Sequence, residues 1–419
     1  MIISRGLQYI STLFPHPLYV VGGAVRDFLM GYTPTDYDIC SCMPPEQVIS
    51  LLKNHKDIAV STTSPKLGTL KISYLGEAYE YTTFRTDSYA LDGSHEPQSV
   101  AFTTSILEDS LRRDFTVNAI YYDIKNEKTI DPLGRIADVD NHIIRTTRPP
   151  QSVFEEDGLR LLRAIRIGAE TNCSISSCTL HSLTQNAFRL QKIAVERVAD
   201  ELDKILVSDT KNNIKDTHIT AISHLIECGL MQYIFPELLS AAGWKSVLRI
   251  LTFAPPKIRL AALLWKATTQ KSNAKDSAKL ANILLTRLRY STSIIARTTH
   301  TIEHHMFNMD LSESKETIHQ FVQKHWDIID DIIALKQADY LDCGVCPSAA
   351  SLQKVKDDMI AHNVPLKVTN LCVNGNDLIA LGTPPAKRGI LLTKLLQKAS
   401  YDYTLITREA QLALLKTLQ

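Results

Sequence analysis

The spacing of apolar residues divides the chain into two parts. Before residue 147, apolar and polar residues alternate in TLKISYL (69–75) and AYEYTTF (78–84), and this period of two predicts strands. The segment PPEQVISLLKNH (44–55) instead spaces its apolar residues three and four apart, which predicts a helix. Strands and helices mixed in this way predict an α/β fold for residues 1–147.

After Pro149 and Pro150 the apolar spacing is helical as far as the last residues. The runs that carry it are LRLLRAIRIGAE (159–170), HLIECGLMQYIF (224–235), RLAALLWKA (259–267), LANILLTRLRY (280–290) and GILLTKLLQKA (389–399). Polar residues accumulate at 209–218, 269–279 and 346–351, where we expect breaks. The sequence therefore predicts an α+β chain, with an α/β head (1–147) and all-helical segments at 148–208, 209–345 and 346–419.

Composition adds limits on the class of protein. A chain of 419 residues exceeds what one core usually organises, so two to four domains are expected. The formal net charge is +1, so a nucleic acid would have to be held by a local basic surface. No apolar run approaches the ~18 residues of a membrane span, and the N-terminus lacks the apolar centre of a signal peptide. We expect a soluble, cytoplasmic protein that binds no membrane.

Eight cysteines are scattered along the chain, and the closest pairs are Cys40/Cys42 and Cys343/Cys346. A lone CxxC without a second pair or a histidine cluster favours free thiols over a zinc or redox site. We expect these thiols to be buried or half-buried.

The stretch YVVGGAVRDFLMGYTPTDYDIC (19–40) carries the first candidate chemistry. A strand followed by a glycine turn at Gly22 and Gly23 and then by a helix presents backbone N–H groups to an anion. Such a turn is more often only a turn, and no established phosphate-loop pattern is present.

Asp36 and Asp38 change that interpretation. In a strand, residues two apart project to one face, so the two carboxylates would converge. Carboxylates held side by side repel each other unless a divalent cation lies between them, and paired Mg²⁺ ions serve nucleotidyl transfer. The alternative is a solvated acidic strand end. A third carboxylate should come from a neighbouring strand, and Glu80 is the best-placed candidate.

Two arginine-rich stretches could complete a nucleotide site. In LRRDFTVNA (111–119), Arg113 could bind a triphosphate, although a surface arginine pair is the ordinary alternative. In FEEDGLRLLRAIR (154–166), a continuous helix would make Asp157 and Arg160 neighbours, and their simplest role would be a salt bridge. Alternatively, a carboxylate and a guanidinium match the donor and acceptor edge that cytosine and adenine share, which would select CTP and ATP without a template.

Together, VVGGAVRD…TDYD, LRRDFTVNA and EEDGLRLLRAIR resemble the class II tRNA nucleotidyltransferases, the CCA-adding enzymes, and the related bacterial poly(A) polymerases. The likeness is strong over the first ~200 residues and weaker in ERVADELDKIL, GLMQYIFPEL and VNGNDLIALG. It implies a seahorse-like fold of head, neck (148–208), body (209–345) and tail (346–419), with the tail binding tRNA.

The resemblance also implies roles for individual residues. Asp36 and Asp38 would bind two Mg²⁺ ions. Glu80 is expected as the third catalytic carboxylate from its place on a predicted neighbouring strand, not from the resemblance. The residues implied to bind the nucleotide are Gly22, Gly23 and Arg26 as contacts, Arg113 for its phosphate, Asp157 and Arg160 for its base, and Arg163 and Arg166 as support for the phosphates and the pocket. The expected reaction is addition of C, C and A to tRNA from CTP and ATP, with release of pyrophosphate.

Departures from the family pattern leave alternatives open. Trp265 and Lys266 stand where some relatives carry an HD phosphohydrolase motif, so we predict no phosphohydrolase activity. The flexible-loop segment 85–102 looks nearly full length, although Ser94 replaces a frequent arginine. CC-adding or A-adding specialists, a poly(A) polymerase and an inactive RNA-binding homologue remain alternatives, and the oligomeric state is unknown. The predicted tRNA surface comprises Arg189, Lys192, Arg197, Lys257, Arg259, Lys266, Arg287, Arg289, Lys387 and Arg388.

Overall fold

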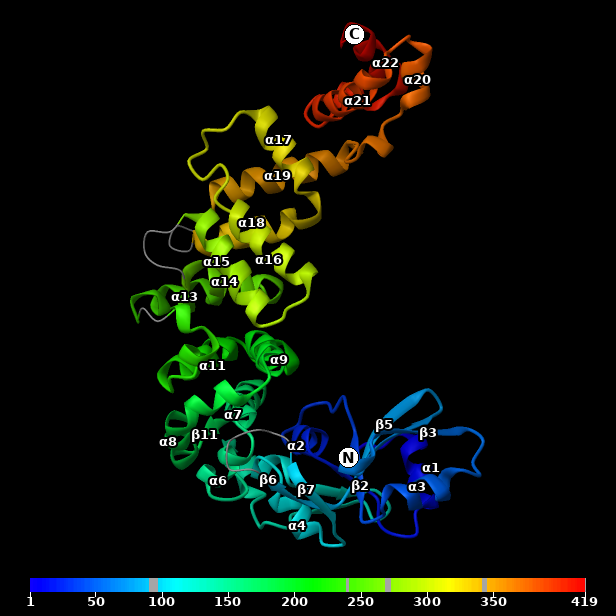
Figure 1. Cartoon of the computed structure of the whole chain (residues 1–419), viewed down its shortest axis with the longest axis vertical. Helices are drawn as coiled ribbons and strands as arrows, with labels where there is room; N and C mark the ends of the chain where they lie inside the picture. Colours follow the sequence, from blue (N-terminus) through cyan, green and yellow to red (C-terminus); the bar gives the residue numbers. More distant parts are fainter. Residues whose placement is uncertain (90–96, 239–240, 268–272, 341–344, 419) are drawn as a thin grey trace. The chain divides into compact units, whose positions relative to one another are not determined.

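The structure, a computed structural model, describes residues 1–89, 97–238, 241–267, 273–340 and 345–418 (Figure 1). The chain forms two compact units, Met1–Leu239 and Ser240–Gln419. The α/β head and the helices that follow it up to residue 238 therefore belong to one unit, while the fourfold division at 147, 208 and 345 stays a prediction. Among the described residues, no helix is both long and apolar enough to span a membrane.

A mixed sheet organises the N-terminal part of the first unit. Its strand order is β3-β4-β5-β2-β1-β8-β9. The strands are β1 (Tyr19–Val21), β2 (Asp38–Ser41), β3 (Ile58–Ser64), β4 (Thr69–Tyr74), β5 (Glu77–Thr83), β8 (Tyr121–Asp123) and β9 (Lys128–Ile130). Neighbouring strands are antiparallel except β2 and β5, which are parallel. Two smaller sheets pair β6 (Arg85–Tyr89) with β7 (Pro97–Phe102) and β10 (Ile143–Ile144) with β11 (Ser174–Ile175).

Short helices accompany the sheet, as the mixed pattern predicted. They are α1 (Arg5–Leu13), α2 (Gly23–Leu29), α3 (Pro45–Leu52), α4 (Ile106–Leu111) and α5 (Ala137–Asp140). Figure 1 shows α1 and α3 beside β2 and β3. Val21, Cys40, Phe84 and Tyr121 form one buried cluster under the centre of the sheet. This core fixes the ends of β1 and β2, which carry the candidate site.

The rest of the first unit is helical apart from β11. Its helices are α6 (Pro150–Glu156), α7 (Leu159–Thr171), α8 (Ser177–Asn186), α9 (Val195–Leu206), α10 (Ser208–Lys211), α11 (Thr217–Glu227) and α12 (Met231–Ile234). The prediction of an all-helical region after residue 147 missed β11. Asn172 ends α7 in a left-handed conformation (φ 53°), and Ser174 N–H then donates to the His142 carbonyl at 2.9 Å. A left-handed asparagine is a common helix stop.

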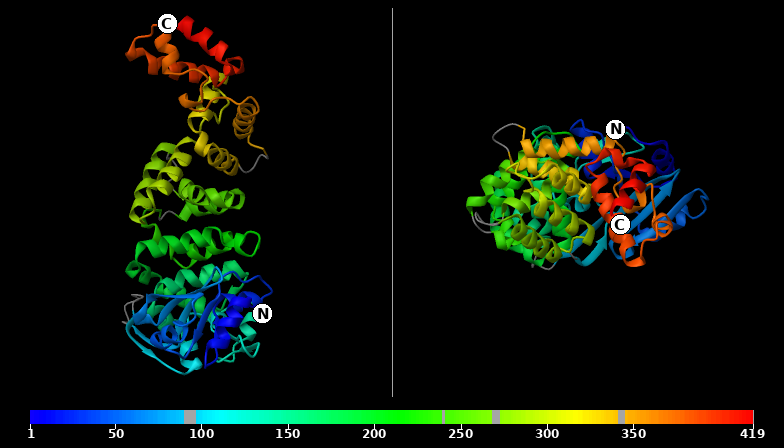
Figure 2. Two further views of the ribbon diagram at one scale, coloured as in Figure 1. Left: turned by 90° about the vertical axis from the view of Figure 1, so that its right-hand side faces the viewer. Right: turned by 90° about the horizontal axis from the view of Figure 1, so that it is seen from above.

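The second unit contains only helices and loops within its described residues (Figure 2). The helices are α13 (Ala241–Phe253), α14 (Arg259–Ala267), α15 (Ala274–Arg287), α16 (Thr292–His304), α17 (Lys315–Lys324), α18 (Ile329–Asp339), α19 (Pro347–Ala361), α20 (Gly375–Ala380), α21 (Pro385–Ala399) and α22 (Arg408–Leu418). Two of the breaks predicted for this unit, at 269–279 and 346–351, are too long, because α15 and α19 begin inside them. Asn273 explains the first, because its side chain accepts the Asp276 N–H at 2.9 Å and caps α15. The polar run is therefore largely a cap and a first helical turn.

The described cysteines are all free. Cys40, Cys173, Cys228 and Cys346 are buried, as expected, whereas Cys178 and Cys372 are exposed. The expectation of burial was therefore wrong for these two, and Cys343 lies outside the described residues.

Candidate active site

The predicted strand, glycine turn and helix are present as β1, Gly22 and α2. Gly22 has φ 81°, a conformation that side chains disfavour, which explains the glycine. A β-carbon at Gly22 would lie 3.6 Å from Asp38 Oδ2 and 4.0 Å from Arg113 Nη1. The turn therefore brings bare backbone close to a carboxylate and a guanidinium.

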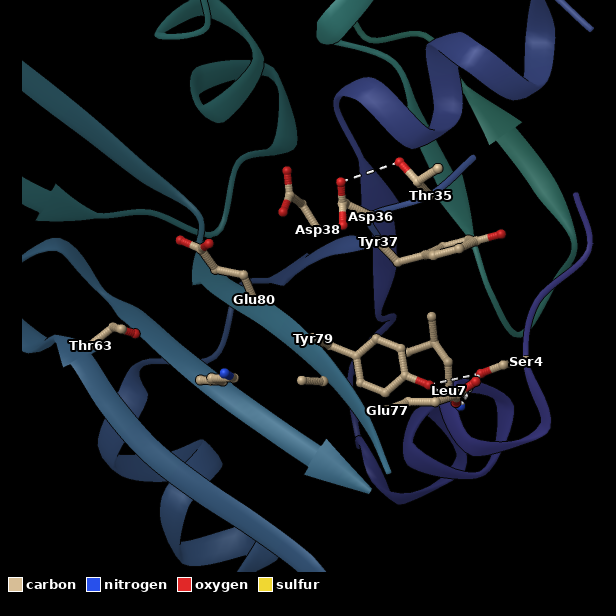
Figure 3. Close-up of a pocket in the computed structure, with 12 residues that line it drawn as sticks. Ser4, Leu7, Thr35, Asp36, Tyr37, Asp38, Thr63, Glu77, Tyr79 and Glu80 are labelled. Carbon is tan, nitrogen blue, oxygen red and sulfur yellow. Dashed lines mark hydrogen bonds between the residues drawn. The ribbon is translucent and has the colours of Figure 1, made fainter. Parts of the chain in front are cut away.

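Asp38 is the first residue of β2, and it links the turn to β5. Antiparallel pairing sets Val21 opposite Asp38, and parallel pairing sets Glu80 beside Asp38. Asp36 precedes the strand, so the prediction that both aspartates lie within it was wrong. The β1 ladder ends at Val21, because the chain turns away at Gly22, and no β1 backbone remains to pair with Asp36. All three carboxylates are nevertheless exposed at one end of a cavity (Figure 3).

The three carboxylates influence one another. Partial burial and repulsion from Glu80 raise the pKa of Asp38 to about 6, against the opposing effect of Arg113. Within the described residues, no group of three or more His, Cys, Asp or Glu side chains forms a ready-made metal site. The arrangement is thus a set of hard oxygen donors that a divalent cation would relieve of mutual repulsion.

Arg113 lies opposite the turn and is held by buried partners. Its Nη2 donates to Asp109 Oδ2 at 3.0 Å, and its Nε donates to the Tyr121 hydroxyl at 3.1 Å. Burial alone would raise the pKa of Asp109, but Arg113 and Arg112 hold it down at about 2. The guanidinium is thereby oriented before any anion arrives.

Asp114 is a buried acceptor that the sequence interpretation did not assign to the site. Its Oδ2 accepts hydrogen bonds from Arg163 Nε at 2.8 Å and Nη2 at 2.6 Å. Its Oδ1 accepts from the Phe115 N–H at 2.8 Å and from Asn118 Nδ2 at 3.1 Å. Burial opposes ionisation, yet Arg163 and Asn118 hold the pKa of Asp114 well below its usual range. The sequence signal was present, because Asp114 and Asn118 both lie in LRRDFTVNA.

Arg26 is 3% exposed and does not point out as a free nucleotide contact. Its Nη1 donates to Asn118 Oδ1 at 2.8 Å, and its Nη2 lies 2.6 Å from Asp27 Oδ1. A β-carbon on Gly23 would lie 3.5 Å from Arg26 Nη2. The structure therefore places Arg26 beneath the turn, where it supports the backbone that carries the two glycines.

The predicted continuous helix around Asp157 is broken. Helix α6 ends at Glu156, Asp157 is extended (φ −148°), and α7 begins at Leu159. The expected Asp157–Arg160 salt bridge is not formed. Asp157 Oδ1 instead accepts the Leu159 N–H, the first N–H of α7, at 2.9 Å, while Oδ2 is 3.8 Å from Arg197 Nη2. One oxygen of Asp157 is therefore used and the other is only weakly engaged.

The arginines of α7 each have an acidic partner. Arg160 Nη1 donates to Glu156 Oε2 at 2.9 Å, and its Nη2 donates to the Arg112 carbonyl at 3.1 Å. Arg166 contacts Glu201 at 2.6 Å and Glu170 at 2.8 Å. The structure thus brings Arg163 near Asp38, while Arg160 and Arg166 join helices to one another.

Comparisons with known proteins identify relatives of this chain. The poly A polymerase head domain family matches residues 18–145, which include both glycines and all three carboxylates. A second family, described as the probable RNA and SrmB-binding site of polymerase A, matches residues 172–241. The CCA-adding enzyme of Ligilactobacillus salivarius (strain UCC118) is 30% identical over 388 residues, covering 90% of this chain and 86% of the relative.

The chain belongs to the CCA-adding enzyme family. A member from Geobacillus sp. (strain WCH70) is 38% identical over 232 residues, where the match covers 55% of this chain and about half (54%) of the relative's length. A crystal structure of the Bacillus stearothermophilus CCA-adding enzyme in complex with CTP has a TM-score of 0.75 at 25% identity, covering 99% of this chain and 97% of that chain.

The predicted flexible loop is described only in part. Ser94 lies outside the described residues, and the parts of the loop segment on either side of it form β6 and β7. Arg189 and Arg259 were wrongly assigned to an RNA-facing surface, because they are only 8% and 5% exposed. Arg189 contacts Glu155 at 2.9 Å, and Arg259 Nε donates to the Ala254 carbonyl at 3.0 Å. Long apolar stems and internal partners draw such arginines inward, which charge counting cannot reveal.

Proposed function

We propose that this chain is a CCA tRNA nucleotidyltransferase that adds C, C and A to tRNA 3′ ends, using CTP and ATP. The observation that carries the proposal is the placement of Asp36, Asp38 and Glu80 beside the Gly22 turn and Arg113, in a chain of the CCA-adding enzyme family. A carboxylate edge next to a phosphate-sized backbone turn suits transfer of a nucleotidyl group.

Asp36 and Asp38 are the residues that we expect to hold divalent metal, with Glu80 contributing the third carboxylate. The raised pKa of Asp38 and the hard oxygen donors fit Mg²⁺, and a pair of such ions held by these carboxylates would stabilise the negative charge that develops during transfer. The terminal ribose 3′ oxygen forms a bond to the α-phosphorus, the bond from that phosphorus to pyrophosphate breaks, and the hydroxyl proton passes to solvent.

Arg113 and Arg163 supply positive charge next to these carboxylates. We infer that the Gly22 and Gly23 backbone and Arg113 bind the triphosphate, and that Arg163 adds a second positive charge beside it. Arg26 and Arg166 support the site through Asn118 and Glu201. Because the arginines are already oriented, binding costs less ordering of side chains.

Base selection is assigned to Asp157 and Arg160. The weakly engaged Asp157 Oδ2 is the oxygen that could accept the exocyclic amino group of cytosine or adenine. Arg160 would have to exchange one of its present partners to donate to the base, and it otherwise acts by joining α6 to α7 around Asp157.

Poly(A) polymerase activity is the second candidate, because the matching head family carries that description. Specialists that add only CC or only A come next, and an inactive homologue is the least favoured because the carboxylates are present. A cytoplasmic location stays a prediction from the sequence.

The decisive experiment supplies tRNA transcripts that end at the discriminator base, at C or at CC, each with one labelled nucleotide. We expect CTP to be added to the first two and ATP to the third, and addition to stop there. Continued ATP addition would identify a poly(A) polymerase, and addition confined to CTP or to ATP would identify a specialist. No addition to any transcript would reject the proposal.

A further inference from the structure

A cavity of about 700 Å³ opens beside the carboxylates (Figure 3). Asp36, Asp38 and Glu80 line one end of it, whereas Gly22 and Arg113 do not line it at all. The other lining residues come from α1, the chain before β2 and the strands β3 to β5: Ser4, Leu7, Thr35, Tyr37, Thr63, Lys71, Glu77, Ala78 and Tyr79. The volume lies within the range of ordinary small-ligand sites.

Two tyrosines on the wall beyond the carboxylates have fixed rings. The Tyr79 hydroxyl is hydrogen-bonded to Ser4 Oγ at 2.8 Å and also donates to Glu77. The Tyr37 hydroxyl donates to the Ile2 carbonyl at 3.1 Å. With both hydroxyls occupied, the tyrosines offer no free hydrogen-bonding group. Tyr79 is only 4% exposed, so the accessible ring surface comes from the half-buried Tyr37.

Lys71 contributes a positive charge close to the carboxylates. The antiparallel register of β4 and β5 sets Lys71 opposite Glu80, so the two side chains share one face of the sheet. Lys71 is exposed, and it forms no ion pair with the residues that the structure describes. Its ammonium group is therefore available to a ligand in the cavity.

We propose that this cavity receives the 3′-terminal nucleoside of the RNA acceptor, with Tyr37 as a stacking surface and Lys71 beside the terminal ribose or its phosphate. The inference rests on the proposed function, which places the triphosphate on the Gly22 and Arg113 side. In-line transfer needs the attacking hydroxyl on the opposite side of the reacting phosphorus, next to the carboxylates.

The chemistry of the wall agrees with what such an acceptor requires. Successive steps would present a discriminator base, then C, then C again, so the acceptor subsite has to accept different bases. Stacking on an aromatic face tolerates any base, because every base has a π-face, whereas hydrogen-bonding side chains would discriminate. The ring of Tyr37, whose hydroxyl is held by the Ile2 carbonyl, meets this need beside a lysine.

Crosslinking tests where the 3′ end of the acceptor binds, and it does not require turnover. Periodate converts the terminal ribose diol of a C-ended tRNA to a dialdehyde, a nearby lysine amine condenses with one aldehyde, and cyanoborohydride reduces the imine to a stable amine. We expect peptide mapping to identify Lys71 as the main site in the wild-type protein. Lys71→Arg should remove this crosslink, and Lys56→Arg, which changes an exposed lysine elsewhere in the head, should not. A main crosslink at any other lysine would overturn the proposal.

Kinetics of Tyr37 variants test the stacking role. Tyr37→Ala should lower kcat/KM for the acceptor tRNA at least about fivefold, whichever base ends the acceptor, because stacking on an aromatic side chain is worth roughly a tenfold effect or more. The KM for CTP should stay within twofold, and Tyr37→Phe should behave like the wild type. Equal loss in both variants, or a loss confined to CTP, would contradict the proposal. If the wild type adds no nucleotide, the proposed function fails, while the crosslink still reports where the acceptor end binds.

Discussion

The substitution Asp114→Asn perturbs the buried acceptor that orients Arg163 (Oδ2 to Nε 2.8 Å). Asparagine has the same size and can still accept the Phe115 N–H and the Asn118 amide through its oxygen. Its NH₂ group would then replace Oδ2 and face the two donors of Arg163. The change therefore converts two charge-assisted hydrogen bonds into a contact between donors, with little change in volume.

The structure sets the size of the expected effect. Breaking a fully buried ion pair by removing one partner costs about 3–5 kcal/mol. Asp114 is 7% exposed, but the Arg163 side chain is 35% exposed and can regain water. We therefore expect Asp114→Asn to lower the free energy of unfolding by about 2–3 kcal/mol at pH 7.

The pH dependence has a definite sign. Because the folded pKa of Asp114 lies well below its unfolded value of about 4, the unfolded chain binds the proton more readily. The advantage of the wild type over Asp114→Asn is thus full above the unfolded pKa and shrinks as pH falls towards the folded pKa.

Urea unfolding of both proteins from pH 7 down to about pH 3 measures this difference directly. Asp57→Asn, which changes an exposed aspartate, is the matched control and should alter stability by less than about 0.5 kcal/mol. The KM for CTP should rise in Asp114→Asn, because Arg163 loses its orientation. A stability within 0.5 kcal/mol of the wild type at pH 7, or a difference that grows on acidification, would refute the reasoning.

Three further outcomes follow from the site. Asp38→Asn should lower nucleotide addition at least about a hundredfold while the tRNA Kd stays within twofold, and normal turnover at ordinary Mg²⁺ would reject the metal assignment. Asp157→Ala should reduce the preference for CTP over UTP, measured as the ratio of kcat/KM, at least about fivefold, whereas an unchanged ratio would leave Asp157 only as the acceptor of the first N–H of α7. Binding of tRNA should weaken about tenfold or more between about 50 and 200 mM salt, and a Kd that is flat over this range would exclude a surface that neutralises several phosphates.

Local patterns were sufficient for the centre of the site. The strand, turn and helix around Gly22 and the strand that carries Glu80 follow from short-range periodicity and from glycine's freedom, so they could be predicted. The pairing of Asp38 with Glu80 was only suspected, because register depends on strands that are not adjacent in sequence.

Features that depend on contacts between distant segments could not be predicted from the sequence pattern. Helical spacing alone predicts one helix through Asp157, but the chain leaves the helical conformation at Asp157, just before Gly158. A β-carbon at Gly158 would lie 3.0 Å from the Arg189 carbonyl, so the close approach of a distant segment belongs to the break. The burial of Arg189 was missed for a similar reason, since its acidic partner Glu155 lies 34 residues away in the sequence. The pairing of Arg163 with Asp114, which are 49 residues apart, was missed for the same reason.

Pairing between arginines and acids also bears on the proposed binding of a triphosphate by a chain of net charge +1. Arg113 is held by Asp109 and Arg163 by Asp114, so in the free protein each positive group is neutralised and oriented by a buried carboxylate. A guanidinium has five donors, and those not used by the acid remain for phosphate oxygens. The acid therefore reduces the ordering that binding would otherwise require, at the expense of some net attraction. It follows that removing Asp114 should impair nucleotide binding almost as much as removing Arg163, and that the two losses should not add in the double variant.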